Sequence, residues 1–278
     1  MKKISRRSFM AAAAVSVAAL AMTACGGSAS SAASSVASSA ASSEAVSSAA
    51  AAELTTVEAG KLTMATNAAF PPYEMTTDAG EFEGIDVDTA KAIAEKLGLE
   101  LQIDDMDFDA ALLSVQQGKA DIVMAGVTVT DERKAVMDFS DSYATGIQSI
   151  IVPNDSDIAS PDDLAGKTIG TQRGTTGYIY CSDDFGDENV VAYDDGLTAV
   201  QALNNGQVDA VVIDNAPAQE FVAANPGLKV LDTSYAEEDY AIGMAEGSAL
   251  EDAVNKALEE LKADGTLQAI VDKYINAN

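Results

Sequence analysis

The chain has 278 residues, 47% of them hydrophobic, and a net charge of −28 from 16 basic and 44 acidic residues. This length and apolar content suffice for one large or two medium cores, while the acidity argues against nucleic acid and anionic lipid surfaces as partners. The sequence contains no histidine, which removes the commonest general base and metal ligand, so we expect no catalytic residue, metal or cofactor.

The N-terminus has the features of an export signal. A basic segment, Lys2–Arg7, precedes an apolar segment, Phe9–Met22, which is too short to span a membrane as a folded helix. Small residues then lead to Cys25, and this pattern resembles the lipobox of bacterial lipoproteins. The resemblance implies a signal peptide over 1–24 and a diacylglycerol on the Cys25 sulfur. An ordinary signal peptide is the alternative, and an Arg-Arg pair leaves the export route open between the Sec and twin-arginine systems.

The segment that follows, 25–56, consists mainly of serine and alanine and cannot bury a core. We interpret it as a flexible tether with a reach of about 30 Å. The body would thus be held by its lipid at the extracytoplasmic face of the cell membrane. With Cys25 lipidated, Cys181 has no partner for a disulfide, and we expect it to be a packed side chain.

From residue 57 onward, predicted strands alternate with predicted helices, which indicates an α/β fold with largely parallel sheets. We expect Asp86 to cap the first helix and Thr130 to cap a short helix that carries Arg133. The predicted strands cover 61–66, 99–103, 122–124, 146–152, 168–170, 190–193, 208–213, 228–231 and 240–244. The predicted helices cover 87–97, 107–117, 197–205, 248–263 and 266–275.

Two segments of the body share a pattern. Residues 115–123 and 203–211 both show a helix end, a glycine, two residues, an aspartate and then an apolar strand. If the repeat is genuine, it predicts two similar lobes, each of which presents the carboxyl end of a strand to a shared cleft. Ligands of open α/β sheets bind at that edge.

Two charged residues follow such strands. Arg133 can offer a planar, permanently charged fork to a carboxylate, although a solvated position on a helix surface is the alternative. Asp214 ends an apolar run, where an acid is costly unless it is paired. Phe70, Tyr73 and Phe108 fit a core equally well, but the first two flank a Pro-Pro loop from which an aromatic ring can cover a ligand.

Six motifs in order resemble the family 3 solute-binding proteins of polar amino acid ABC transporters. The motifs are Ala69–Tyr73, Gly84–Asp88, Met106–Phe108, Ala125–Arg133, Gly174–Gly177 and Val212–Asp214. The resemblance implies a two-lobe, type II periplasmic-binding-protein-like α/β fold with two crossover hinges that closes on its ligand. Lobe 1 would comprise 57–142 and 243–278 and lobe 2 would comprise 148–238, with hinges at 143–147 and 239–242.

The resemblance also implies roles for individual residues. Arg133 would pair with the α-carboxylate, with help from the backbone N–H groups of Thr128 and Thr176. Asp214 would hold the α-ammonium, together with the Gly126 carbonyl and the Thr128 hydroxyl. The full set of expected ligand-binding residues is Asn67, Phe70, Tyr73, Phe108, Ala125, Gly126, Thr128, Arg133, Gln172, Thr175, Thr176 and Asp214.

The identity of the ligand depends on the side-chain pocket. Asn67 stands where members that take basic or amide side chains often have aspartate, and Gln172 and Ile213 also differ from some of them. We therefore expect a neutral or polar L-amino acid, with cystine or a related sulfur amino acid as an alternative. The expected role is a monomeric receptor that delivers a free amino acid to an ABC transporter permease. A cyclohexadienyl-dehydratase-like enzyme on the same fold, or a ligand-sensing partner of a membrane receptor, are the alternatives.

Overall fold

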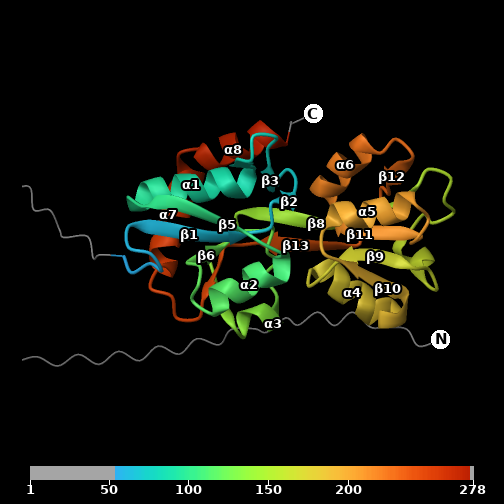
Figure 1. Cartoon of the computed structure of the whole chain (residues 1–278), viewed down its shortest axis with the longest axis horizontal. Coiled ribbons are helices and arrows are strands. Elements are labelled where there is room, and N and C mark those ends of the chain that lie inside the picture. Colours follow the sequence, from blue (N-terminus) through green and yellow to red (C-terminus); the bar gives the residue numbers. More distant parts are fainter. Residues whose placement is uncertain (1–53, 276–278) are drawn as a thin grey trace, which may run out of the picture. The chain divides into compact units, whose positions relative to one another are not determined.

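The computed structural model describes residues 54–275, which contain two main β-sheets (Figure 1). The signal peptide, Cys25 and most of the tether lie outside the described residues. The first sheet has the strand order β5-β1-β6-β14-β7, and we call it and its helices lobe 1. Its strands are β1 (Lys61–Thr66), β5 (Glu100–Asp105), β6 (Ile122–Val123), β7 (Met137–Phe139) and β14 (Gly243–Ala245).

The second sheet has the order β10-β9-β11-β8-β12, with β13 also paired to β8, and we call it and its helices lobe 2. Its strands are β8 (Ala144–Pro153), β9 (Ile169–Gln172), β10 (Val190–Tyr193), β11 (Ala210–Asp214), β12 (Leu228–Val230) and β13 (Ala236–Tyr240). Both sheets are mixed, so the prediction of largely parallel sheets is wrong in part. β8 runs antiparallel to β11 and β13, and β14 runs antiparallel to β6 and β7.

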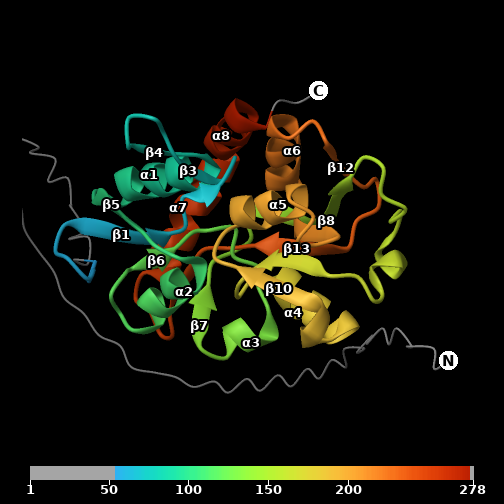
Figure 2. The same cartoon turned by 45° about the vertical axis from the view of Figure 1, so that its right-hand side comes forward.

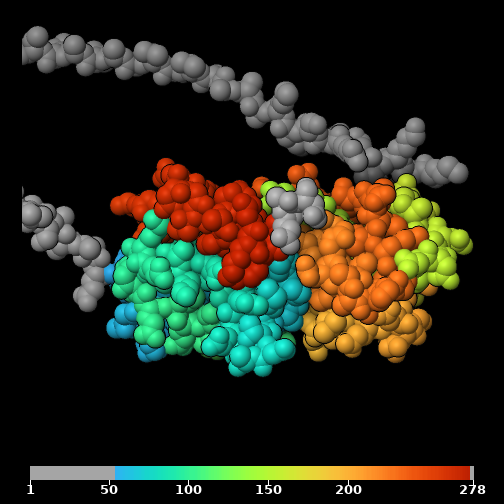
Figure 3. Space-filling model, turned by 90° about the horizontal axis from the view of Figure 1, so that it is seen from above, coloured from blue at the N-terminus to red at the C-terminus, as the bar shows by residue number. Residues whose placement is uncertain are grey.

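Helices cover the faces of both sheets. In lobe 1, α1 packs against α7 and α8, and Figure 3 shows these C-terminal helices lying over the α1 segment. The lobe 1 helices are α1 (Ile85–Leu97), α2 (Phe108–Gln116), α3 (Asp131–Lys134), α7 (Glu251–Ala263) and α8 (Thr266–Tyr274). The lobe 2 helices are α4 (Thr176–Phe185), α5 (Gly196–Asn204), α6 (Asn215–Ala224) and the 3-10 turns η1 (Pro161–Leu164) and η2 (Asp187–Asn189). Within residues 54–275, no helix is both long enough and apolar enough to cross a membrane.

For helix α1, the predicted buried face is correct and the predicted N-terminal cap is wrong. Its apolar face is buried as the 3.6-residue period requires, with Ala90, Ile93 and Ala94 inaccessible or nearly so. Asp86, however, does not cap the helix, which begins at Ile85 after Gly84. The Asp86 carboxylate instead accepts hydrogen bonds from distant parts of lobe 1. The prediction failed because the helix starts earlier than its first apolar residues suggested.

Two crossover segments pair with each other between the sheets. β8 and β13 run antiparallel, with Gly146 opposite Glu238 and Ala144 opposite Tyr240, and they lie side by side in both views (Figures 1 and 2). Gly146 is required at this contact, because a Cβ there would lie 2.6 Å from Cε1 of the Tyr240 ring. The ring of Tyr240 is therefore held directly against the paired strands.

A small third sheet was not predicted from the sequence. It has the order β2-β3-β4, from β2 (Ala69–Phe70), β3 (Glu74–Thr76) and β4 (Phe82–Glu83). The Pro-Pro loop connects β2 to β3 and brings Phe70 directly opposite Glu74. In lobe 2, Cys181 is buried and free, as predicted.

Candidate functional site

A cleft between the two lobes contains all but one of the predicted ligand-binding residues. Its lining residues are Asn67, Phe70, Glu74, Phe108, Ala125, Gly126, Thr128, Arg133, Gln148, Gln172, Thr175, Thr176, Ile213, Asp214 and Tyr240. The exception is Tyr73, which lines an adjoining cleft of about 510 Å³ that also reaches Asp214. Glu74, Gln148 and Tyr240 are the lining residues that the sequence analysis did not single out.

Arg133 is buried in this cleft, with only 8% of its surface exposed. Thr130 caps α3 by accepting a hydrogen bond from the Arg133 backbone N–H, as predicted, and this sets the direction of the side chain. Its Nη1 donates to the Thr128 carbonyl at 2.8 Å, and its Nη2 donates to the Gly174 carbonyl at 3.1 Å. The guanidinium lies 5.4 Å from the centre of the Phe108 ring. The alternative of a solvated surface arginine is therefore wrong.

The charge of Arg133 is only partly balanced by the protein. Burial lowers the pKa of the guanidinium, and the nearby Glu238 carboxylate acts in the opposite direction. Within the described part of the chain, no carboxylate lies within salt-bridge distance of Arg133. A planar cation with spare donors in a low-dielectric cleft favours a bidentate carboxylate.

Asp214 lies at the carboxyl end of β11 and is 2% exposed. Its carboxylate caps α6 through the Ala216 backbone N–H at 3.0 Å and also accepts from the Ile147 N–H at 2.7 Å. Burial raises the pKa of Asp214 to about 6, although the two backbone N–H groups and the Tyr240 hydroxyl act in the opposite direction. A neighbouring cation would lower this pKa, so the position favours an ammonium group.

Hydrogen bonds join the two lobes across the cleft. Gln172 Nε2 donates to Asn67 Oδ1 at 2.8 Å, and the hydroxyls of Thr128 and Thr176 lie 3.3 Å apart. The Arg133–Gly174 bond also runs from lobe 1 to lobe 2. Gly174 has a φ of 73°, and a Cβ at this position would collide with the Asp109 carboxylate. The lobes are thus in close contact around the predicted site.

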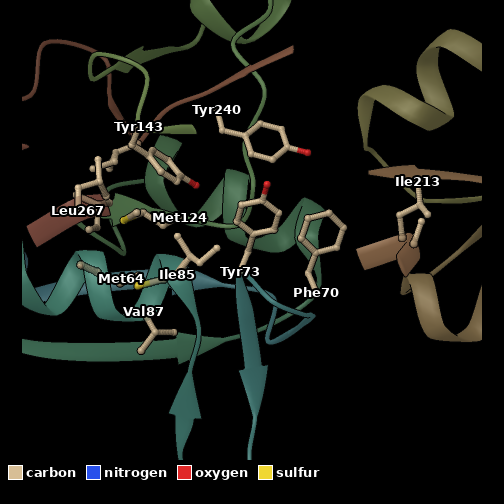
Figure 4. Close-up of a cluster of buried hydrophobic side chains, with 14 of the residues drawn as sticks. Met64, Phe70, Tyr73, Ile85, Val87, Met124, Tyr143, Ile213, Tyr240 and Leu267 are labelled. Atoms are coloured by element: carbon tan, nitrogen blue, oxygen red, sulfur yellow. The ribbon is translucent and has the colours of Figure 1, made fainter. Parts of the chain in front are cut away.

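Aromatic rings form one wall of the cleft. The Phe70 and Tyr73 rings stack with centroids 5.8 Å apart, and Tyr240 meets Tyr73 edge to face at 5.5 Å. Figure 4 shows these three rings together, Tyr240 from the end of β13, with Ile213 of β11 facing them. Tyr73 lies behind Phe70 in this stack, which explains why it does not line the cleft itself. Such a wall suits the apolar part of an amino acid side chain.

Glu74 adds an acid that the sequence analysis missed. It is fully buried, it lines the cleft, and neither carboxylate oxygen has a hydrogen-bond partner among residues 54–275. Burial raises the pKa of Glu74 well above its ordinary value, and the neighbouring Asp86 adds to the effect. A signal for Glu74 was present in the sequence, since it follows an apolar, proline-rich segment. Asp214 was selected by the same argument, that an acid beside an apolar run is costly unless it is paired.

Glu238 supports the site from behind. Its Oε2 accepts from the Thr128 hydroxyl at 3.1 Å and from Gln148 Nε2 at 2.9 Å. The hydroxyl hydrogen of Thr128 and an amide hydrogen of Gln148 are therefore both directed at this carboxyl group. Thr128 then accepts from the Thr176 hydroxyl, 3.3 Å away, and the Gln148 amide oxygen remains an acceptor that suits a donor such as an ammonium group.

Comparison with known proteins decides the family. The profile of the bacterial extracellular solute-binding proteins, family 3, matches residues 62–277. The chain belongs to this family. This solute-binding protein is 32% identical to the L-cystine-binding protein TcyJ of Escherichia coli (strain K12) over 225 residues, which is 80% of this chain and 85% of TcyJ. It is 34% identical to the arginine-binding extracellular protein ArtP of Bacillus subtilis (strain 168) over 224 residues, 77% of this chain and 86% of ArtP.

Solved structures agree with this assignment. The solute-binding protein resembles an ancestral arginine-binding protein bound to arginine, with a TM-score of 0.74 and 42% identity, over 78% of this chain and 99% of that one. It also resembles an ancestral arginine-binding protein bound to glutamine, with a TM-score of 0.74 and 41% identity, over 78% of this chain and 98% of that one. The predicted type II periplasmic-binding-protein fold is confirmed. These relatives are binding proteins of amino acid transport and not enzymes, so the enzyme alternative is not supported.

Proposed function

We propose that the protein captures a free L-amino acid outside the cytoplasm and delivers it to an ABC transporter permease. The observation that carries this proposal is the pair of buried opposite charges, Arg133 from lobe 1 and Asp214 from lobe 2, in one cleft. A zwitterionic α-amino acid can present its carboxylate to the first and its ammonium group to the second. Each charge-assisted hydrogen bond in such a site contributes about 1.5–3 kcal/mol.

The same arrangement couples binding to closure of the lobes. Arg133 and Thr128 belong to lobe 1, while Thr176 and Asp214 belong to lobe 2, so a ligand satisfies both sets only when the lobes approach each other. A ligand shifts a conformational equilibrium by its differential affinity for the two states. The closed form would therefore be the form that reports the presence of ligand to a permease.

We further propose that the ligand has a cationic side chain, with L-arginine as the first candidate. Asn67 led us to expect a neutral or polar side chain. Glu74 outweighs it in this proposal, since its buried carboxyl group lines the cleft and can become the counter-ion of a cationic side chain. The names of ArtP and of the ancestral arginine-binding protein agree with this choice, whereas the name of TcyJ keeps L-cystine as the second candidate.

Thermal unfolding with a panel of amino acids tests the ligand class. A ligand at about 100 times its Kd stabilises the folded protein by about 2.7 kcal/mol. We expect L-arginine to raise the unfolding temperature more than L-glutamine or L-cystine does, and Glu74→Gln to reduce this preference. Glu83→Gln, an exposed acid on β4, is the matched control. A panel in which L-cystine alone stabilises the protein would contradict the cationic ligand but leave the amino acid receptor intact.

We also propose that the protein is anchored by a lipid on Cys25, which lies outside the described residues. The proposal rests on the small residues before Cys25 and on the serine- and alanine-rich segment after it. Expressed in a bacterium with lipoprotein processing, the wild-type chain should sediment with membranes and partition into detergent. Cys25→Ser should block lipid attachment and retain the unprocessed precursor, detected by its larger mass. A Cys25→Ser chain that is processed and distributed like wild type would contradict the anchor.

A further inference from the structure

Two buried carboxyl groups lie side by side at the edge of the cleft. Glu74 and Asp86 are both fully buried, and three of their four side-chain oxygens have no hydrogen-bond partner among the described residues. The fourth oxygen, Asp86 Oδ2, accepts from the Gly126 backbone N–H at 3.0 Å and from the Tyr143 hydroxyl at 2.8 Å. The Gly126 and Tyr143 donors therefore serve Asp86, whereas Glu74 faces the Asp86 carboxyl group itself.

The groups around Glu74 do not supply a positive charge. Asp86 faces it from α1, Asp105 from the end of β5 and Asp214 from the end of β11, and all three raise its pKa. Tyr73 and Tyr143 also lie nearby, and burial, with the carboxyl groups adding to it, raises the pKa of each. The basic group of the same cleft, Arg133, is bonded to carbonyl oxygens of Thr128 and Gly174.

Two adjacent carboxyls in such surroundings cannot both be ionised. The hydrogen bonds to Asp86 favour its ionised form, so the proton of the pair resides on Glu74. Burial raises the pKa of Asp86 only to about 6, which leaves it mostly ionised at neutral pH. Glu74 consequently enters the binding reaction as a neutral acid.

We infer that the site exchanges this proton for the side-chain cation of its ligand. The Glu74 O–H bond breaks when the cation arrives, the proton leaves to solvent and buffer, and the carboxylate stays behind as the counter-ion. Charge is balanced, because one positive charge enters the cleft and one leaves it. A neutral side chain would leave Glu74 protonated and could accept a hydrogen bond from it. This inference rests on the proposed cationic ligand and adds a mechanism by which the external pH sets its affinity.

The exchange is measured by isothermal titration calorimetry of the full-length wild-type protein with L-arginine. Titrations at about pH 7.5 in phosphate and in Tris give the number of protons released, because the two buffers differ in ionisation enthalpy. We expect close to one proton per L-arginine, and an affinity that rises up to about tenfold per pH unit while Glu74 remains protonated in the free protein. Asp214 contributes little at this pH, because its pKa is about 6.

Titrations with a neutral ligand and with two variants identify the group that releases the proton. L-Citrulline has nearly the shape of L-arginine but no side-chain charge, so its binding should release almost none. Glu74→Gln should remove the release seen with L-arginine, while Glu83→Gln on the adjacent strand should keep it. Glu74→Asp serves as the second variant if Glu74→Gln does not fold, and it should keep a release whose pH dependence is shifted.

The outcomes separate this inference from the proposed function. L-Arginine that binds without any dependence on the buffer would overturn the proton exchange and leave the cationic ligand standing. Release that persists in Glu74→Gln would also overturn it, because the proton would then come from another group. A protein that binds only neutral amino acids would overturn the cationic ligand and the exchange with it.

Discussion

Replacing Arg133 with alanine should weaken binding of the amino acid at least about 100-fold. The guanidinium is buried and would make two charge-assisted hydrogen bonds to the α-carboxylate, each contributing about 1.5–3 kcal/mol. The substitution also removes the bond to the Gly174 carbonyl, which joins the lobes at 3.1 Å. Calorimetry with the ligand found in the panel measures the loss directly. Arg133→Lys should recover only part of it, since an ammonium group lacks the planar fork.

Arg173→Ala is the matched control for this prediction. Arg173 is an exposed residue of the neighbouring loop, and its contact with Asp194, at 3.4 Å, is a surface ion pair. Such pairs contribute about 0–1 kcal/mol, so this variant should bind nearly as wild type does. If Arg133→Ala bound as tightly as Arg173→Ala, the proposed carboxylate clamp would be wrong.

Asp214→Asn should cause a loss of similar size at the other end of the ligand. The amide keeps the shape of the side chain and can still cap α6 through its oxygen, but it carries no charge for the ammonium group. Calorimetry should show an affinity at least about 100-fold lower, from about 3 kcal/mol of lost charge-assisted bonding. Asp195→Asn is the control, since Asp195 caps α5 through the Thr198 N–H at 2.7 Å outside the cleft.

The titration of Asp214 also predicts how the stability of the same variant compares with that of the wild type. Its pKa in the folded protein is raised to about 6 from 3.8. A raised carboxyl pKa favours the folded state below pH 3.8, and this contribution is lost as the pH rises to about 6. Asp214→Asn removes this cost of the buried charge, but its amide can accept from only one of the two backbone N–H groups, Ala216 or Ile147. The two effects oppose each other, so the ligand-free variant should unfold close to the temperature of the wild type at neutral pH. Large destabilisation of the ligand-free variant would indicate a structural role for the charge.

The sequence predicted the position of a site residue correctly where a charged side chain follows a buried strand. Arg133 and Asp214 each follow a buried strand, and both lie in the cleft as predicted from that position. The mixed sheets could not be foreseen, because the direction of β8 and β13 depends on how the chain crosses between lobes. Asp86 was assigned to its own helix because local capping is visible in a sequence, whereas its partners Gly126 and Tyr143 are distant along the chain.

The proposed ligand class depends on geometry that the sequence does not display. Asn67, Gln172 and Ile213 suggested a neutral or polar side chain from their residue types. The Asn67 amide oxygen in fact accepts from Gln172 of the other lobe, while the acid of the pocket is provided by Glu74. The two positions are seven residues apart, and only the turn through the Pro-Pro loop brings them to one cleft.

The three-stranded sheet β2-β3-β4 has a consequence for how such receptors diversify. Phe70 and Glu74 face each other within it, apart from helix α3, which carries Arg133, and strand β11, which carries Asp214. In the proposed site, the residues assigned to the amino acid backbone and the acid assigned to its side chain therefore belong to separate parts of the architecture. A few substitutions in this three-stranded sheet can therefore change which amino acid binds, while the residues that bind the amino acid backbone stay the same.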